Sequence, residues 1–383
     1  MALKINQQIG IIQVSYTPEF FKRAMNNYKF GYFWDIIALY EQAEIDSHVM
    51  GCIEGRQDGY KTSWRLTEAT SSPQDKEIKD FVEAVFMGLD MFDLFDFIHD
   101  ARLKEFSIIE PTWEVINGKQ WVTKVEKINQ RYFRRDMADH KLKINGFGSE
   151  MTAIPEEEIL VCESVKPALL IPVVRDFILK EFGIECFASF IENFGEGFIL
   201  GTYPPGAGQE VKDELEAAVN KLGASSRGIK PEGTSIDIIE SKKGTTDHDK
   251  FIEIGKNGIS VTLLGHENAV TNRGGMQIGE SQAPYKAQRA KVIADIVFIE
   301  KFMYQFEKMI VNRNYLNVKK YPIFSIERSE PIDTTLRLAV IDSAYAKGFK
   351  VSADEFGKLG LIVAEDQEPF LTRDFNNPAD TGI

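Results

Sequence analysis

The stretch that decides the fold is Val292–Ile310, VIADIVFIEKFMYQFEKMI. Its apolar residues recur at alternating spacings of four and three: Val292, Ile296, Ile299, Met303, Phe306 and Ile310. That spacing places them on one face of an α-helix. With Ser281 as N-cap and Pro284 in the first turn, the pattern predicts a single helix to about Tyr315, roughly 50 Å long at 1.5 Å per residue. A helix of this length favours an extended, oligomeric object over a compact enzyme.

The composition around this helix is that of an ordinary folded protein. The chain has 383 residues, of which 43% are hydrophobic and 27% charged, and this length predicts two or three structural regions. Its longest stretch without a charged side chain, Ile5–Pro18, is shorter than the ~20 apolar residues of a membrane span. The N-terminus also lacks an apolar signal segment. We therefore expect neither a membrane helix nor export.

The charge and the cysteines exclude two further classes. With 45 basic and 58 acidic side chains the net charge is −13, which argues against a protein that coats nucleic acid over its whole surface. Cys52, Cys162 and Cys186 are few and widely spaced, so we expect no disulfide framework and a reducing compartment.

The first third of the chain reads as mixed helix and strand. Asp46 is suited to cap a short helix, and a long acidic helix is expected from about Asp75 past Phe95. Two strands then flank Asn117-Gly118, a strong hairpin-turn signal.

The middle of the chain predicts two helices that flank a small α/β insert, followed by a glycine-rich loop before the long helix. The elements expected after the first third are the helix Leu169–Phe194, the strand Gly197–Tyr203, the helix Glu210–Leu222, the strand Ser235–Glu240, the helix Thr246–Leu264, the loop Gly265–Gly279, the strand Ile323–Glu327 and the helix Thr334–Lys347.

Motifs that would carry chemistry are missing from the sequence. The five histidines have no metal-ligand spacing, and the glycine-rich residues 272–276 lack the Lys-Ser/Thr ending of a phosphate-binding loop. Asp90, Asp93, Asp96 and Asp100 share a helix face that is best interpreted as solvated. Arg131, Arg134 and Arg135 could touch phosphates, but a structural strand is the favoured interpretation. We predict no catalytic residue, no metal and no cofactor.

Ordered short motifs carry a resemblance to a known family. The segments are Leu39-Tyr40-Glu41 with Asp46–Val49, Phe106–Trp113, Arg131-Tyr132-Phe133, Leu169–Val174 with Glu192–Gly195, and Ile259–Gly265. Together they resemble the portal proteins of Mu-like tailed bacteriophages over about residues 39–315. Two positions depart from the family pattern, because Glu105 stands where glycine is usual and Glu196 where proline is common.

The resemblance implies an α+β portal fold that assembles into a ring, dodecameric in the virion. The implied parts are an N-terminal wing at 1–165, a first stem helix at 166–195, a clip at 196–244, a second stem helix at 245–265, a tunnel loop at 266–282, the long wing helix with a return strand at 283–325, and a C-terminal region with a short crown at 326–383.

The function implied by the resemblance is a channel at the unique capsid vertex, for packaging and ejection of double-stranded DNA. The implied partners are further copies of the chain, that DNA, the large terminase, a head-completion adaptor and the major capsid protein, with no membrane partner. The implied locations are the virion and, during assembly, the host cytoplasm. On this basis His266, Asn272, Arg273 and Gln277 are expected to face DNA, Lys242 and Lys243 to lie in the lumen or at the clip junction, and Tyr203, Gln209, Arg227 and Lys230 to contact subunits and the adaptor.

Two alternatives stay open from the sequence. Another capsid or tail-adaptor protein with similar helices would have a different stoichiometry and no central channel. A nucleic-acid-processing enzyme would show metal- or nucleotide-dependent turnover.

Overall fold

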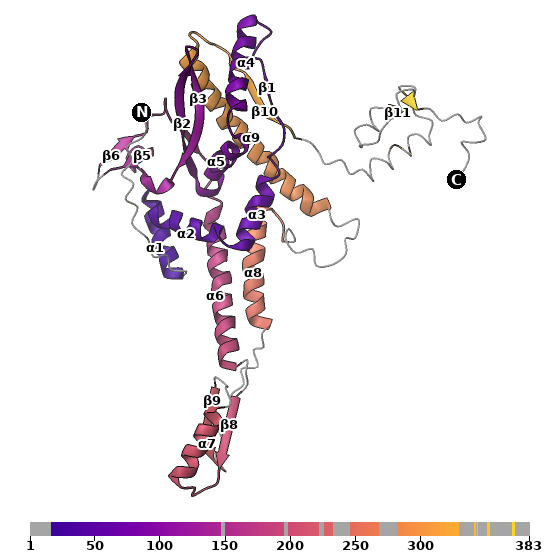
Figure 1. Ribbon diagram of the computed structural model, residues 1–383. Coiled ribbons are helices and arrows are strands. Elements are labelled where there is room, and N and C mark those ends of the chain that lie inside the picture. The colour runs from indigo at the N-terminus through magenta and orange to yellow at the C-terminus, as the bar shows by residue number, and fades with distance from the viewer. Residues whose placement is uncertain are drawn as a thin grey trace, which may run out of the picture. The chain divides into compact units, whose positions relative to one another are not determined.

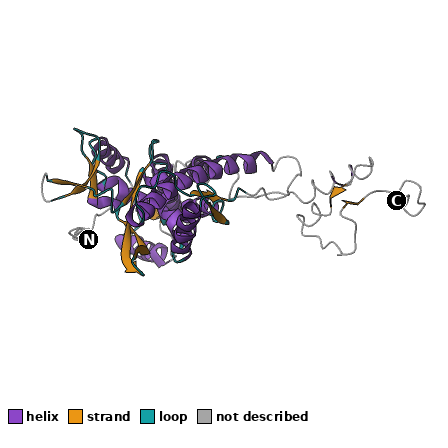
Figure 2. Ribbon diagram, turned by 90° about the horizontal axis from the view of Figure 1, so that it is seen from above, coloured by secondary structure: helices purple, strands orange, loops and turns teal. Residues whose placement is uncertain are grey.

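The computed structural model describes residues 17–146, 150–194, 198–221, 226–232, 246–267 and 282–328, together with 341, 343, 351–352 and 370–371. The chain divides into two compact units, residues 1–327 and residues 328–383. Helices and strands are intermixed in the first unit (Figure 2), as expected for an α+β protein.

The first unit contains nine α-helices among its described residues, besides a short 3-10 helix at Gln130–Tyr132. They are α1 (Pro18–Lys29), α2 (Trp34–Glu44), α3 (Ser47–Gln57), α4 (Pro73–Met87), α5 (Met91–Lys104), α6 (Leu170–Phe194), α7 (Gln209–Lys221), α8 (Thr246–Leu263) and α9 (Gln282–Asn314). The predicted long helix is thus confirmed as α9. The single helix predicted from Asp75 past Phe95 is wrong, because Asp90 accepts hydrogen bonds from the backbone N–H groups of Phe92 and Asp93 and so begins a second helix, α5.

The strands of the first unit form small sheets. They are β1 (Trp64–Thr67), β2 (Phe106–Ile116), β3 (Lys119–Ile128), β4 (Phe133–Arg135), β5 (Leu142–Asn145), β6 (Met151–Ala153), β7 (Leu160–Glu163), β8 (Phe198–Tyr203), β9 (Ser226–Pro231) and β10 (Ile323–Ile326). Three antiparallel sheets have the orders β3-β2-β7, β4-β5-β6 and β1-β10. The β2–β3 hairpin turns at Asn117 and Gly118, both at positive φ, which confirms the predicted turn.

In the middle of the chain, α6, β8, α7 and α8 lie close to their predicted positions, whereas β9 was not predicted. Gly183 does not interrupt α6, and α6 packs along α8 (Figure 1). Between them in sequence, β8 pairs in parallel with β9 and α7 connects the two strands. The strand predicted at Ser235–Glu240 lies outside the described residues.

Two apolar clusters hold the first unit together. One joins the buried faces of α1, α2, α3, α6 and α8, and the other lies among α4, α5, α9 and the strands that they cover. Helix α9 contacts α3, α4, α5, β3, β7 and β10, so the seam predicted from the sequence is the main packing surface of the second cluster.

In the second unit, β11 (Val351–Ser352) pairs antiparallel with β12 (Phe370–Leu371). The helix predicted at Thr334–Lys347 lies outside the described residues except for 341 and 343, which are helical.

Candidate functional site

The base of the predicted tunnel loop is the part of that loop which the structure describes. Helix α8 ends at Leu263, and Gly265 follows it at a φ of 92°, which suits glycine. The N–H of Gly265 donates to the carbonyls of Ser260 and Val261. His266 follows, half-buried beside Gln288, and burial lowers its pKa below the ordinary value of 6.5. At neutral pH this imidazole is therefore uncharged. Asn272, Arg273 and Gln277 lie outside the described residues.

The last carbonyls of α8 are capped by cations from other helices. Nζ of Lys291 on α9 donates to the carbonyls of Val261 and Thr262, at 3.1 and 2.6 Å. Nη1 of Arg56 on α3 donates to the carbonyl of Leu263 at 2.8 Å. The C-terminal end of a helix has unpaired carbonyls and a partial negative charge. Lys291 and Arg56 donate hydrogen bonds to these carbonyls and bring positive charge to that end.

A buried ion cluster holds Arg56 in place. Nη2 of Arg56 lies 2.8 Å from Oδ1 of Asp295 on α9, and Nε of Arg56 also donates to Asp295. Nε2 of His99 on α5 lies 3.3 Å from Oδ2 of Asp295, and the guanidinium of Arg102 lies nearby. Burial alone would raise the pKa of Asp295. The interactions with His99 and Arg56 outweigh this effect and hold the pKa of the carboxyl well below its usual range.

Helix α9 makes one further bond to α3 near this cluster. Nε2 of Gln288 donates to the carbonyl of Gly55 at 3.0 Å. We call Arg56, Gln288, Lys291 and Asp295 the loop anchor. Through it, the end of α8 and the first half of α9, which flank residues 268–281 in the sequence, are both fixed to α3.

The helices α6 and α8 approach each other closely enough to require glycine. A Cβ built at Gly255 would lie 2.8 Å from the carbonyl oxygen of Asp176 and from Cβ of Lys180. A Cβ at Gly258 would overlap the carboxylate of Asp176. Nζ of Lys180, itself buried, forms an ion pair with Asp46, the N-cap of α3. Helix α3 is therefore the common support of α6, α8 and α9.

The predicted clip residues have partners within their own chain where their side chains are described. Nζ of Lys212 lies 5.3 Å from the ring centroid of Tyr203, and Nε2 of Gln209 donates to Oδ1 of Asp213 at 2.8 Å. Arg227 and Lys230 lie in β9, and their side chains are outside the described set. Lys242 and Lys243 fall outside the described residues.

Arg131, Arg134 and Arg135 have structural partners within the chain, which agrees with the favoured interpretation. Arg131 is paired with Glu41, and Arg135 is paired with Glu105 and Glu163, both at 2.9 Å. Arg134 is buried beneath the ring of Tyr32. These side chains are not presented as an open phosphate-binding row.

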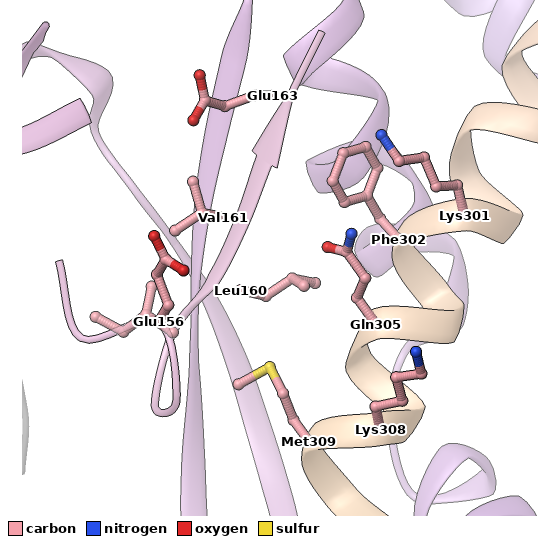
Figure 3. Close-up of a pocket in the computed structure, with 10 residues that line it drawn as sticks. Glu156, Leu160, Val161, Glu163, Lys301, Phe302, Gln305, Lys308 and Met309 are labelled. Atoms are coloured by element: carbon pink, nitrogen blue, oxygen red, sulfur yellow. The ribbon is translucent and has the colours of Figure 1, made fainter. Parts of the chain in front are cut away.

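A groove of about 480 Å³ lies between β7 and α9 (Figure 3). Glu156 and Glu163 border it on the strand side, and Lys301 and Lys308 on the helix side, above an apolar floor that includes Leu160 and Phe302.

The described part of the chain holds no group of three or more His, Cys, Asp or Glu residues placed to bind a metal ion. Within that same part, no helix is long and apolar enough to cross a membrane.

The loop anchor was not predicted from the sequence, although a signal for it exists. Asp295 falls three residues after Val292 and one before Ile296, inside the apolar seam of α9. Arg56 follows Cys52 and Ile53 at helical spacing. A charged residue on an apolar helix face indicates a buried ion pair.

Comparison with known proteins places this architecture in a family. The family model described as "Portal protein of Mu bacteriophage" matches residues 37–359. The Mu-like prophage FluMu protein gp29 of Haemophilus influenzae is 22% identical over 379 residues, covering 90% of this chain and 71% of that protein. The portal protein of Escherichia phage Mu is 24% identical over 341 residues, covering 84% of this chain and 63% of that protein.

One solved structure, an HK97 family phage portal protein from Corynebacterium diphtheriae, matches with a TM-score of 0.43 and 10% identity, over 79% of this chain and 96% of that one. The family model, which covers most of the chain, identifies the protein: it belongs to the portal protein family of Mu bacteriophage.

Proposed function

We propose that copies of this chain close into a ring, a dodecamer in the virion, whose central channel passes double-stranded DNA during packaging and ejection. The ring occupies the unique vertex of the capsid and is assembled in the host cytoplasm. Its partners are the major capsid protein, the large terminase and a head-completion adaptor. The chain itself catalyses no reaction, and the hydrolysis that drives packaging belongs to the terminase.

The observation that carries this proposal, beside family membership, is the loop anchor. A loop that meets moving DNA needs two fixed ends, and Arg56 and Lys291 hold the end of α8 while Gln288 and Asp295 hold α9. The net charge of −13 per copy also suits a channel through which DNA slides, because strong phosphate binding would hold the DNA in place.

Within this proposal the parts keep their expected roles. Residues 1–165 and 283–325 form the wing, 166–195 and 245–265 the stem, 196–244 the clip, 266–282 the tunnel loop and 326–383 the C-terminal region with its short crown. Asn272, Arg273 and Gln277 reach DNA from the tunnel loop, with His266 at its base, and Lys242 and Lys243 line the lumen or the clip junction. Tyr203, Gln209, Arg227 and Lys230 contact subunits and the adaptor from the clip.

The experiment is a packaging assay in which capsids are assembled with and without the chain. We expect nuclease-protected, genome-length DNA only in capsids that contain it, and we expect Arg273→Glu to slow packaging or ejection without preventing ring assembly. Equal amounts of protected DNA in capsids that lack the chain would contradict the proposal. The purified chain should show neither nuclease nor ATPase activity.

A further inference from the structure

Strand β7 is the outer strand of its sheet, and the groove of about 480 Å³ runs beside it. The sheet order is β3-β2-β7, so β7 has a strand partner on one side only among the described strands. The groove lies between β7 and α9, and Val161 and Glu163 are among the residues that line it. A further strand could therefore be added to the sheet within this groove.

The backbone groups on the free edge of β7 follow from its register with β2. The N–H of Ser164, just beyond the strand, donates to the carbonyl of Glu105 at 2.8 Å. In an antiparallel ladder, alternate residues direct their N–H and C=O groups to the partner strand. Cys162 therefore bonds to β2, whereas the N–H and C=O groups of Val161 and Glu163 point to the free edge.

The helix wall of the groove carries two lysines whose charges are not balanced within the described part of the chain. Lys301 and Lys308 are two turns apart on α9, or about 10 Å along its axis. Their Nζ atoms lie over the rings of Phe302 and Tyr304, 4.7 and 4.4 Å from the centroids. Neither ammonium has a carboxylate partner among the described residues. Two uncompensated positive charges thus lie beside an open strand edge.

The carboxylates of the strand wall leave this positive charge largely available. Glu163 is already paired with Arg135, with Nη1 2.9 Å from Oε2, and it points away from α9 (Figure 3). Glu156 is exposed in the turn before β7, at one end of the groove. A ligand of the groove therefore meets positive charge on its α9 side.

The two walls define which side chains a strand added to β7 would need. Such a strand presents alternate side chains to α9 and to the opposite face of the sheet. Toward α9 it meets Lys301 and Lys308, which favour acidic side chains. On the opposite face it lies beside Val161, which favours an apolar side chain. The four residues of β7 span about 13 Å, close to the separation of the two lysines.

We infer that this groove docks an extended segment of another protein, which adds a strand to β7 and places acidic side chains at alternate positions against Lys301 and Lys308. The hydrogen bonds of the free edge supply affinity, and the two lysines select an acidic sequence. The inference goes beyond the proposed function and does not depend on ring closure, because every residue that carries it belongs to one copy.

The test titrates the full chain into a labelled, end-capped octapeptide that alternates glutamate and valine, with fluorescence anisotropy as the readout. We expect saturable binding to wild type. Affinity should fall about fivefold for Lys301→Glu and for Lys308→Glu, and about tenfold or more for K301E/K308E. Lys286→Glu is the matched control and should bind within about twofold of wild type, since Lys286 is an exposed lysine of the same helix outside the groove.

The strand edge is tested separately from the charges. Val161→Pro removes an N–H that faces the groove without removing a bond to β2, and proline is tolerated at such a position of an edge strand. We expect about fivefold weaker peptide binding, with far-UV circular dichroism to verify folding. The same peptide with N-methylated valines should bind wild type as weakly, because the valines are the residues that would pair with Val161 and Glu163.

Three results would overturn the inference. They are the absence of saturable binding up to about 1 mM wild-type chain, equal affinity for a peptide with lysine in place of glutamate, and undiminished binding by K301E/K308E. Peptide binding by isolated copies that disappears on assembly into rings would assign the groove to a second copy of this chain, and would overturn the inference as well.

Discussion

Arg56 and Asp295, 239 residues apart in the sequence, form a two-point ion pair that is fully buried between α3 and α9. The remaining guanidinium nitrogen of Arg56 donates to the last carbonyl of α8. One side chain thereby joins three helices at the base of the loop. The stability of the region should depend strongly on this pair.

Replacing Arg56 with Met should destabilise the fold by about 3–5 kcal/mol, because the carboxylate of Asp295 stays buried without its main partner. The double variant R56M/D295L should lose less free energy of unfolding than Arg56→Met alone, since it leaves no unpaired buried charge. Urea unfolding measures both effects. As a control, Lys124→Met removes an exposed pair with Glu126 and should change the free energy of unfolding by less than about 1 kcal/mol. Equal losses in the free energy of unfolding for Arg56→Met and Lys124→Met would contradict a special role of the buried pair in stability.

Glu307 on α9 predicts a pH dependence. It is fully buried, neither carboxyl oxygen has a hydrogen-bond partner among the described residues, and burial raises its pKa from 4.5 to about 9. Between these two values the folded chain holds a proton that the unfolded chain releases. The contribution of Glu307 to stability therefore falls as pH rises through this window, by up to about 1.4 kcal/mol per pH unit.

Glu307→Gln removes that titration. The stability of the variant relative to wild type should thus increase from pH 5.5 to pH 8.5, as measured by urea unfolding at intermediate steps. A difference that stays constant with pH would contradict the raised pKa.

Two glycine substitutions should have opposite effects on stability, because only one of the two glycines lies in the close contact between α6 and α8. Gly255→Ala should destabilise the protein by about 1–3 kcal/mol, because the new Cβ would collide with the backbone of Asp176 and with Lys180. Gly51→Ala on α3 meets nothing within 4 Å and should stabilise by about 0.5–1 kcal/mol through helix propensity. Thermal unfolding distinguishes the two, and a stabilising Gly255→Ala would mean that the helices do not pack this closely.

Glu105 ends α5 with φ of 80°, a conformation that favours glycine. Its carboxylate accepts bonds from Arg135 and from the hydroxyl of Tyr28, and these hold the side chain there. Glu105→Ala loses both bonds and keeps the unfavourable φ, whereas Glu105→Gly loses the bonds but relieves the backbone. We expect the alanine variant to be less stable by about 1 kcal/mol than the glycine variant. Equal stabilities in chemical unfolding would argue against a strained backbone at this position.

Local patterns in the sequence were enough to predict most of the elements that support the site. The seam from Val292 to Ile310 identifies α9, and Asn117-Gly118 identifies the hairpin, because both signals depend only on neighbouring residues. The break between α4 and α5 was missed for the same reason. The apolar spacing continues across Gly88, and the capping role of Asp90 was not recognised. The interpretation of the aspartate row as solvated is wrong at Asp100, which is buried and paired with Lys104 and Lys127.

The contacts that build the loop anchor could not be read from spacing. Arg56 meets Asp295 and Leu263 only because three distant helices come together, and no local periodicity encodes which charged residues pair across such separations. What the sequence does contain is the anomaly itself, since Asp295 and Glu307 both interrupt an otherwise apolar helix face. Arg56 balances the charge of Asp295, and the raised pKa of Glu307 keeps that side chain protonated.

The most direct test of the central claim is electron microscopy of the purified chain, with the rotational symmetry of class averages counted. The account predicts closed rings of about a dozen copies around a central hole. Particles that stay monomeric or dimeric at all concentrations, including in the presence of the capsid and scaffold proteins with which a portal assembles, would contradict it.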